Sequence, residues 1–223
     1  MRTDYVTAPV VSEKTKKTSS FLGQSIFRFE ADRLPVAIIL ALFALDVLVF
    51  ALVPFWPIVL AFGIASMFTK GCIAAWNHHH QHVMFFKHSV FNRMMEVVFG
   101  LMTGAVSKVW VLHHNIGHHE NYMDQTKDES AWRAPDGRIM GAAEYTWKLA
   151  ISGYPCAFKN GEGRSGDRLL MGTMLALQLA IVGALLWINW FAALAIFVVP
   201  MLFSFIVTCR HTYDHHAGCS EED

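Results

Sequence analysis

Three clusters of histidine are the residues of this chain best suited to chemistry. Eleven of the 12 histidines fall within residues 77–82, 113–119 and 211–216, and only His88 stands apart. Each cluster contains two histidines four positions apart, a spacing that places both side chains on one face of a helix. Neutral imidazole is a ligand for iron, zinc, copper and nickel. The three clusters together predict a metal site with nitrogen ligands, and their spacing alone leaves the metal open.

The spacing of the clusters excludes two common metal sites. His119 is followed by Glu120, but the sequence does not continue to the H-E-x-x-H pattern of zinc proteases. The chain also has no E-x-x-H pair, the motif of carboxylate-rich di-iron bundles. The ligand set is therefore expected to consist almost entirely of histidine.

The three clusters resemble the three-box signature of the membrane fatty-acid desaturase and hydroxylase superfamily. The resemblance spans residues 78–216 and includes the position of the boxes relative to the apolar segments. It implies two iron ions, O2 as co-substrate, and no catalytic side chain beyond the metal ligands. The ligands that it implies are His78, His82, His114, His118, His119, His211, His215 and His216. Residues that would support these ligands or lie at the surface are His79, His80, His113, Asn115 and Asp214.

The composition indicates a membrane protein. Hydrophobic residues make up 54% of the chain and charged residues 16%, a balance unlike that of soluble domains. Apolar runs predict membrane spans at about 35–53, 58–76, 169–188 and 191–208. The first run has 19 residues, about 28 Å of helix, close to the thickness of a bilayer core. We therefore expect an all-α integral membrane four-helix bundle of two hairpins, with a cytosolic histidine-rich cap.

The distribution of basic residues predicts the orientation of this bundle. None of the 18 lysines and arginines lies in the short turns at 54–57 and 189–190, and only Lys70 lies inside a span. By the positive-inside rule both turns face away from the cytosol. We therefore expect a multi-pass protein whose termini and histidine boxes all lie in the cytosol. The formal net charge of zero gives no indication of a nucleic-acid partner.

The chain divides into three predicted parts. Residues 1–33 form a cytosolic N-terminal tail and interfacial segment, in which 21–33 reads as an amphipathic helix, either on the membrane surface or packed on the protein. Residues 34–216 form the desaturase-like membrane domain, and residues 217–223 a short C-terminal tail. Family members usually continue further, and many acyl desaturases have two residues between the first two histidines of the last box. The possibility therefore stays open that this chain is truncated and that its last box lies beyond residue 223.

Several polar residues outside the boxes have two interpretations. Glu120, Asp124, Asp128 and Glu129 follow the second cluster and either accept hydrogen bonds from ligating imidazoles or form a solvated face. Asp46 lies inside a span and is expected to be structural. Lys70 is expected to extend its side chain to the near membrane surface. The apolar residues of 90–112 follow helical spacing and either line an acyl tunnel or form a helix on the membrane, which we favour.

The function implied by the resemblance is oxidation of a lipid. Removing hydrogen from an unactivated methylene requires a metal or cofactor, because no side chain is a strong enough oxidant. We expect a fatty-acyl desaturase supplied with electrons by a separate ferredoxin-like or haem protein. One alternative is a hydroxylase or ketolase of an alkane, sterol or carotenoid. A remote alternative is a membrane metal-binding or transport protein, which would place ligands near mid-bilayer.

Overall fold

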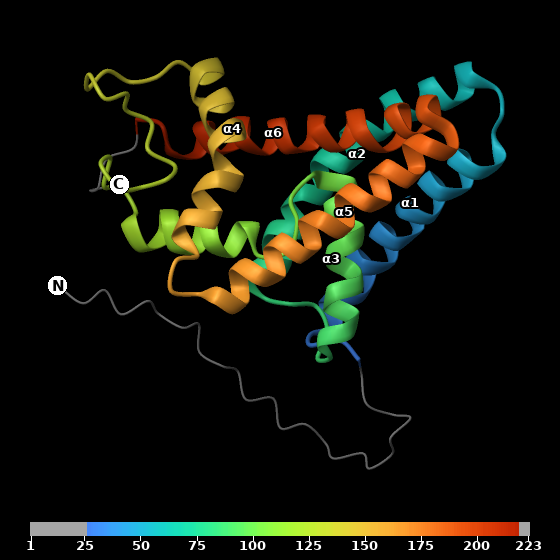
Figure 1. The fold of residues 1–223 in the computed structure, drawn as a ribbon, viewed down its shortest axis with the longest axis horizontal. Helices are drawn as coiled ribbons and strands as arrows, with labels where there is room; N and C mark the ends of the chain where they lie inside the picture. Colours follow the sequence, from blue (N-terminus) through green and yellow to red (C-terminus); the bar gives the residue numbers. More distant parts are fainter. Residues whose placement is uncertain (1–25, 219–223) are drawn as a thin grey trace, which may run out of the picture.

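The computed structural model describes residues 26–218, which confirm the predicted all-α class with six α-helices (Figure 1). The α-helices are α1 (Arg33–Leu52), α2 (Trp56–His82), α3 (Ser89–Thr103), α4 (Ala142–Asn160), α5 (Ser165–Ala192) and α6 (Val199–His216). Short 3-10 helices are η1 (Glu30–Asp32) and η3 (His119–Asn121), and the π-helices are η2 (Trp110–His118) and η4 (Ala193–Val198).

Within residues 26–218, three helical segments are long and apolar enough to cross a membrane: Glu30–Leu52, Trp56–His82 and Ser165–His216. The last has 52 residues and contains α5, η4 and α6. Its backbone breaks at Asn189, where φ is −153° and ψ is 90°. Figure 1 shows the chain reversing direction there, at the same end as the α1–α2 turn. Contact between the rings of Trp56 and Phe191, with centroids 6.2 Å apart, joins the two turns.

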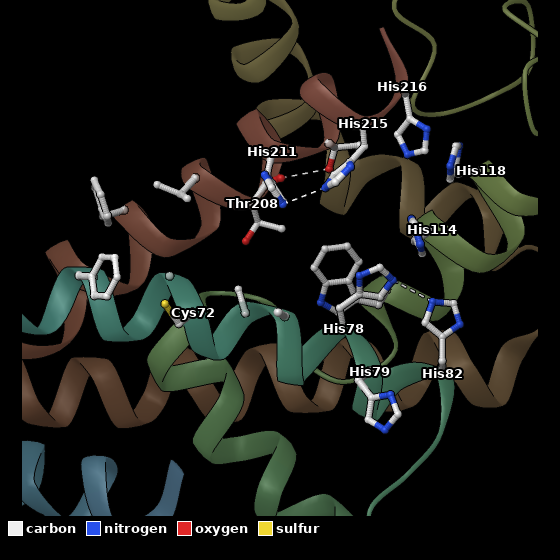
Figure 2. A pocket seen from close by; sticks show the side chains of 18 of the residues that line it. Cys72, His78, His79, His82, His114, His118, Thr208, His211, His215 and His216 are labelled. Atoms are coloured by element: carbon white, nitrogen blue, oxygen red, sulfur yellow. Dashed lines mark hydrogen bonds between the residues drawn. The ribbon is translucent and has the colours of Figure 1, made fainter. Parts of the chain in front are cut away.

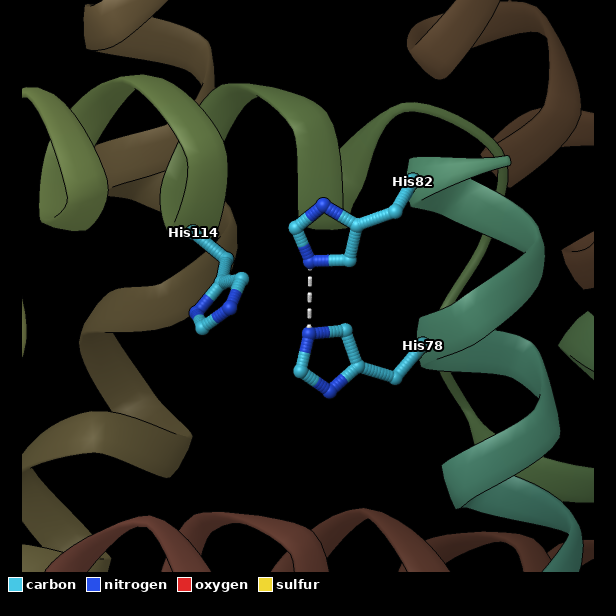
Figure 3. Close-up of side chains that lie close together, drawn as sticks. All are labelled: His78, His82 and His114. Carbon is cyan, nitrogen blue, oxygen red and sulfur yellow. Dashed lines mark hydrogen bonds between the residues drawn. The ribbon is translucent and has the colours of Figure 1, made fainter. Parts of the chain in front are cut away.

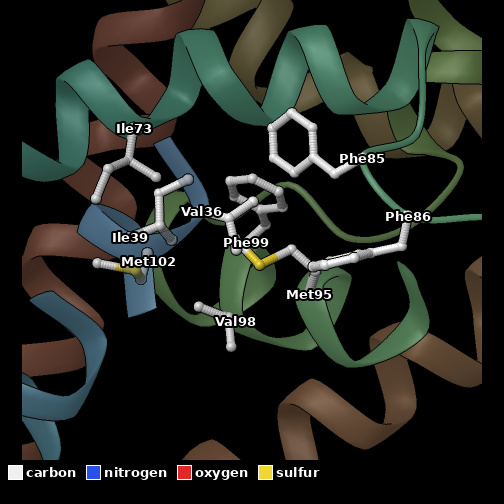
Figure 4. Close-up of a cluster of buried hydrophobic side chains, with 9 residues drawn as sticks. All are labelled: Val36, Ile39, Ile73, Phe85, Phe86, Met95, Val98, Phe99 and Met102. Atoms are coloured by element: carbon white, nitrogen blue, oxygen red, sulfur yellow. The ribbon is translucent and has the colours of Figure 1, made fainter. Parts of the chain in front are cut away.

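The end of α2 that carries the first histidine cluster is packed on a cluster of buried apolar side chains (Figure 4). Val36 and Ile39 come from α1, Ile73 from α2, and Phe99 and Met102 from α3. The helix predicted from the spacing in 90–112 is confirmed as α3. Its apolar face fills this core, and no residue of α3 lines the large cavity described below. The tunnel interpretation is therefore wrong for α3, whereas Trp110, later in the same segment, does line the cavity.

The segment before α1 is held by the loop that follows α2. Phe27 forms an antiparallel bridge with Phe86, and the Arg28 N–H donates to the carbonyl of Phe85 at 2.8 Å. Because residues 26–29 pair in this extended form, the amphipathic helix predicted over 21–33 is wrong for that part. Residues 1–25 and 219–223, which include most of the predicted terminal tails, lie outside the described residues.

A buried ion pair joins the apolar helices. The Oδ2 atom of Asp46 in α1 lies 3.0 Å from Nζ of Lys70 in α2, and the two side chains are only 2% and 1% exposed. The Lys70 ammonium also donates to the carbonyl of Ile196 in η4, and Ser204 of α6 donates to the backbone carbonyl of Lys70 at 2.9 Å. The expectation that Lys70 reaches the membrane surface is wrong, because a buried carboxylate and carbonyl attract its charge inward. These contacts connect α1, α2, η4 and α6.

Breaking this pair from one side should destabilise the protein strongly. Lys70→Met leaves the Asp46 carboxylate buried without its counter-ion, which costs about 3–5 kcal/mol, whereas replacing both partners with apolar residues is often neutral. We expect a large drop in the thermal unfolding temperature of the detergent-solubilised protein for Lys70→Met, and recovery in the Asp46→Leu/Lys70→Met double variant. Lys127→Met, which removes an exposed partner of Asp124, is the control. A double variant as unstable as the single one would contradict this account.

Candidate metal centre

The first two histidine clusters meet where α2 ends against η2 (Figure 3). His78 and His82 lie one turn apart on α2, and their Nε2 atoms approach to 2.8 Å. His114 of η2 points at the same place. One nitrogen from each of the three lies within 4.8 Å of the others, a spacing suited to a shared metal ion.

The π-helical form of η2 explains why both histidines after His114 face it. On an α-helix, at about 100° per residue, a residue five positions on lies about 140° away around the axis. A π-helix closes its hydrogen bonds between residues five apart, which brings that residue onto the next turn of the same face. The rings of His114 and His119 have centroids 4.5 Å apart, and those of His114 and His118 5.2 Å.

Side-chain amides stabilise the unusual turns of η2. Asn160, the last residue of α4, donates to the carbonyl of Leu112 at 3.3 Å. Asn121 donates to the carbonyls of Ile116 and Gly117, each at 3.3 Å. A side chain at Gly117 would collide with Asn160, since a Cβ there would lie 2.4 Å from its amide nitrogen. A larger residue at this position would therefore displace the side chains of Asn160 and Glu129.

The third cluster completes a continuous chain of ring contacts. His216 lies against His118, with centroids 4.6 Å apart. His211 and His215 pair on the exposed face of α6 with their Nε2 atoms 2.9 Å apart. The ring centroids of His215 and His216 are 6.5 Å apart. All eight histidines singled out in the sequence line one cavity of about 1440 Å³, and Figure 2 labels each of them except His119.

One imidazole is already held in the form that a metal requires. Nδ1 of the buried His118 lies 2.7 Å from a carboxylate oxygen of Asp128, itself buried. The Nε2 atom of His118 is buried too and has no hydrogen-bond partner within residues 26–218. A carboxylate on one ring nitrogen fixes the tautomer and leaves the lone pair of the other nitrogen available. This donor set fits a metal that prefers nitrogen ligands.

Burial favours the neutral form of two histidines of the second cluster, His114 and His119. The pKa of His114 is lowered far below its usual range by burial, and neighbouring imidazoles, His78 first among them, lower it further. Burial and His118 likewise lower the pKa of His119. Only the neutral imidazole has a lone pair for a metal, so these shifts make both side chains competent ligands at neutral pH.

Hydrogen bonds between α2 and the loop before η2 set the distance between the first two clusters. Asn77 and Gln81 lie next to His78 and His82 in the sequence and are buried. The amide of Asn77 donates to Thr103 at 2.9 Å and to the carbonyl of Ala105 at 3.2 Å, and Gln81 accepts the N–H of Lys108 at 3.3 Å. We call these contacts of Asn77 and Gln81 the α2 clamp.

The five residues expected to support the ligands differ in their position relative to the cavity. His79 lines the cavity and lies 3.8 Å from Asp32. His80 is fully buried and turned away from the cavity, where its Nδ1 accepts the N–H of Phe85. A separate cavity of about 40 Å³ lies beside His113, whose pKa burial lowers to about 4. Asp214 pairs with Arg210 on the surface, and Asn115 lines neither cavity.

Two aromatic residues of the site were not singled out from the sequence. Trp110 stacks on His78, with centroids 4.9 Å apart and planes 5° apart. The ring of Tyr122 contacts those of His118 and His216, with centroid distances of 5.3 and 5.9 Å. Trp110 lies four residues before His114, so the helical spacing already used for the histidines was the signal that could have identified it.

Asp128 should control metal affinity through His118. In Asp128→Asn the ring loses a charged acceptor, and loss of such a contact typically lowers metal affinity about 10- to 100-fold. The measurement is metal binding by the detergent-solubilised protein, titrated with Fe²⁺ under anaerobic conditions. Asp136→Asn removes an exposed carboxylate that pairs with Arg138 and should bind like the unmodified protein. Equal affinity in both variants would show that Asp128 does not act on the metal.

Comparison with known proteins was made at three levels. No curated protein and no solved structure matches the chain. The family model for fatty acid desaturases matches residues 51–223, which contain all three histidine clusters and α2 to α6. The match covers more than half of the chain, and it agrees with the histidines of the three clusters that line one cavity. The chain therefore belongs to the fatty acid desaturase family, whose members are di-iron oxidoreductases.

Proposed function

We propose that this protein is an O2-dependent di-iron desaturase that introduces a double bond into the acyl chain of a lipid. The observation that carries the proposal is the convergence of eight histidines, from three separate parts of the chain, on one cavity. The same cavity continues between apolar side chains of α2 and α6. Metal ligands and an apolar wall in one space suit oxidation of a hydrocarbon chain.

The proposed iron ligands are the eight histidines of the sequence pattern: His78, His82, His114, His118, His119, His211, His215 and His216. Support comes from the nitrogen atoms of the first two clusters, which lie close enough to share an ion. The contact between His118 and Asp128 adds to this support. When bound, two irons would supply the activation of O2 that removal of hydrogen from a methylene requires.

The reaction consumes electrons as well as O2. Conversion of two neighbouring methylenes to a double bond, with O2 reduced to two waters, requires two further electrons and two protons. We infer that these two electrons come from a ferredoxin-like or haem donor protein, because histidine side chains cannot supply them. The protein's own part is to hold the imidazoles close together and to keep the acyl chain beside them.

We infer a four-span topology of two hairpins, with the histidines and both termini at the cytosolic side. α2 and α6 both end at the cavity, and the two turns that lie together at the other end contain no basic residue. A transporter would place its ligands near mid-bilayer along a pathway. Here the ligands lie at the ends of the apolar helices, which favours an enzyme.

Metal and product analysis of the purified protein test this function. We expect about two irons per chain and, with saturated acyl lipid, a ferredoxin, its reductase and NADPH, a product lighter by two hydrogens. His114→Ala should lose most of the iron and the activity. His88→Ala, which changes the one histidine outside the clusters, should retain both. A hydroxylated product would favour the hydroxylase alternative, and a well-folded protein containing only zinc would argue against the proposal.

A further inference from the structure

The large cavity continues as an apolar groove away from the histidines. It is lined by one face of α2 and one face of α6, and Figure 2 shows Cys72 of α2 and Thr208 of α6 on its two sides. The residues that form its walls, here called the α2–α6 groove, are Ile64, Met67, Phe68, Gly71, Phe203 and Val207.

This groove opens sideways, in the part of the helices that would lie in the bilayer. Within the described chain Ile64 is 59% exposed, Phe68 77% and Phe203 41%. All three belong to candidate membrane spans. Large apolar side chains exposed on such helices face lipid rather than water. A lipid tail can therefore reach the groove without leaving the bilayer.

The groove also has the direction and length of a lipid tail. Ile64 and His78 are 14 residues apart on one helix, which corresponds to about 21 Å along its axis. That is roughly two thirds of the ~30 Å apolar thickness of a bilayer. The histidine end lies at the end of the apolar helix, and the other end lies inside the span. A tail aligned with the helices would thus keep its head group at the surface.

The charge of the cavity distinguishes between acyl carriers. Its lining within residues 26–218 contains histidines and apolar or small polar residues, but no lysine or arginine. Coenzyme A carries several phosphate groups, which proteins bind mainly with arginine and lysine. The lining offers no such partner, whereas the tail of a membrane lipid requires only apolar contacts.

We propose that the substrate is the acyl chain of an intact membrane lipid, which enters the α2–α6 groove sideways from the leaflet next to the histidines. This inference rests on the proposed function for its chemistry, because the acyl chain must pass beside the metal. The competing occupants are an acyl chain on coenzyme A and another protein segment that covers the groove.

Gly71 provides a variant that fills the groove. Within the described chain, a Cβ at Gly71 meets no atom within 4 Å, so a larger side chain starts in open space there. Gly71 lines the cavity, whereas Gly183 of α5 is equally open but lies outside it. Gly71→Phe should block the acyl chain, and Gly183→Phe is the matched control.

The test is photo-crosslinking of the iron-free protein in lipid nanodiscs, with peptides mapped by mass spectrometry. The probe is phosphatidylcholine with a diazirine in the acyl chain, compared with the same acyl group on coenzyme A. We expect labelling of residues 64–75 to exceed that of the exposed α5 residue Leu179, which reports ordinary surrounding lipid. This excess should fall about tenfold in Gly71→Phe, which corresponds to a loss of about 1.4 kcal/mol in binding free energy. It should persist in Gly183→Phe.

Two results would overturn the inference. One is labelling of the groove by the coenzyme A probe alone. The other is phosphatidylcholine labelling no stronger at residues 64–75 than at Leu179, as expected if another protein segment occupies the groove. Because crosslinking needs no metal, iron content measured separately shows whether the proposed function itself has failed.

Discussion

The hydrogen bonds of the α2 clamp are the constraint on which the metal centre depends. Asn77 and Gln81 are buried and alternate with His78 and His82 along the last turns of α2. One face of the helix therefore holds the loop before η2 while the adjacent face presents two imidazoles. A buried polar group without a partner costs about 1–3 kcal/mol, so the loop cannot move away cheaply. The first and second clusters are thus fixed relative to each other before any metal is considered.

Polar contacts inside the apolar part of the molecule extend this constraint to the third cluster. The ion pair between Asp46 and Lys70, with Lys70 also bound to Ile196 and Ser204, fixes α6 along α2. Because His211, His215 and His216 lie at the far end of α6, the contacts within the spans determine where these histidines stand at the surface. Helix packing and ligand placement are therefore one problem in this protein.

The sequence could predict those features that depend on local patterns. Apolar runs identified the long helices, histidine spacing identified the cavity lining, and helical spacing identified α3. Features that depend on tertiary contacts could not be predicted. Nothing local shows that Asp128 rather than Glu120 or Asp124 reaches His118, or that His80 turns toward α3. Lys70 was misjudged because a single charged residue in a span gives no indication of a partner on another helix. The ligand assignment itself stays a prediction.

The π-helical turns of η2 couple the backbone to whatever the imidazoles bind. His114 and His119 face each other only in this form, because an α-helix would turn His119 away. Any ion held by both side chains therefore favours the π form over the α form. By thermodynamic linkage, an interaction that stabilises the π form also strengthens binding of the ion. The amides of Asn160 and Asn121, whose hydrogen bonds to carbonyls of η2 stabilise the π form, therefore raise the affinity for that ion as far as they raise the population of the π form.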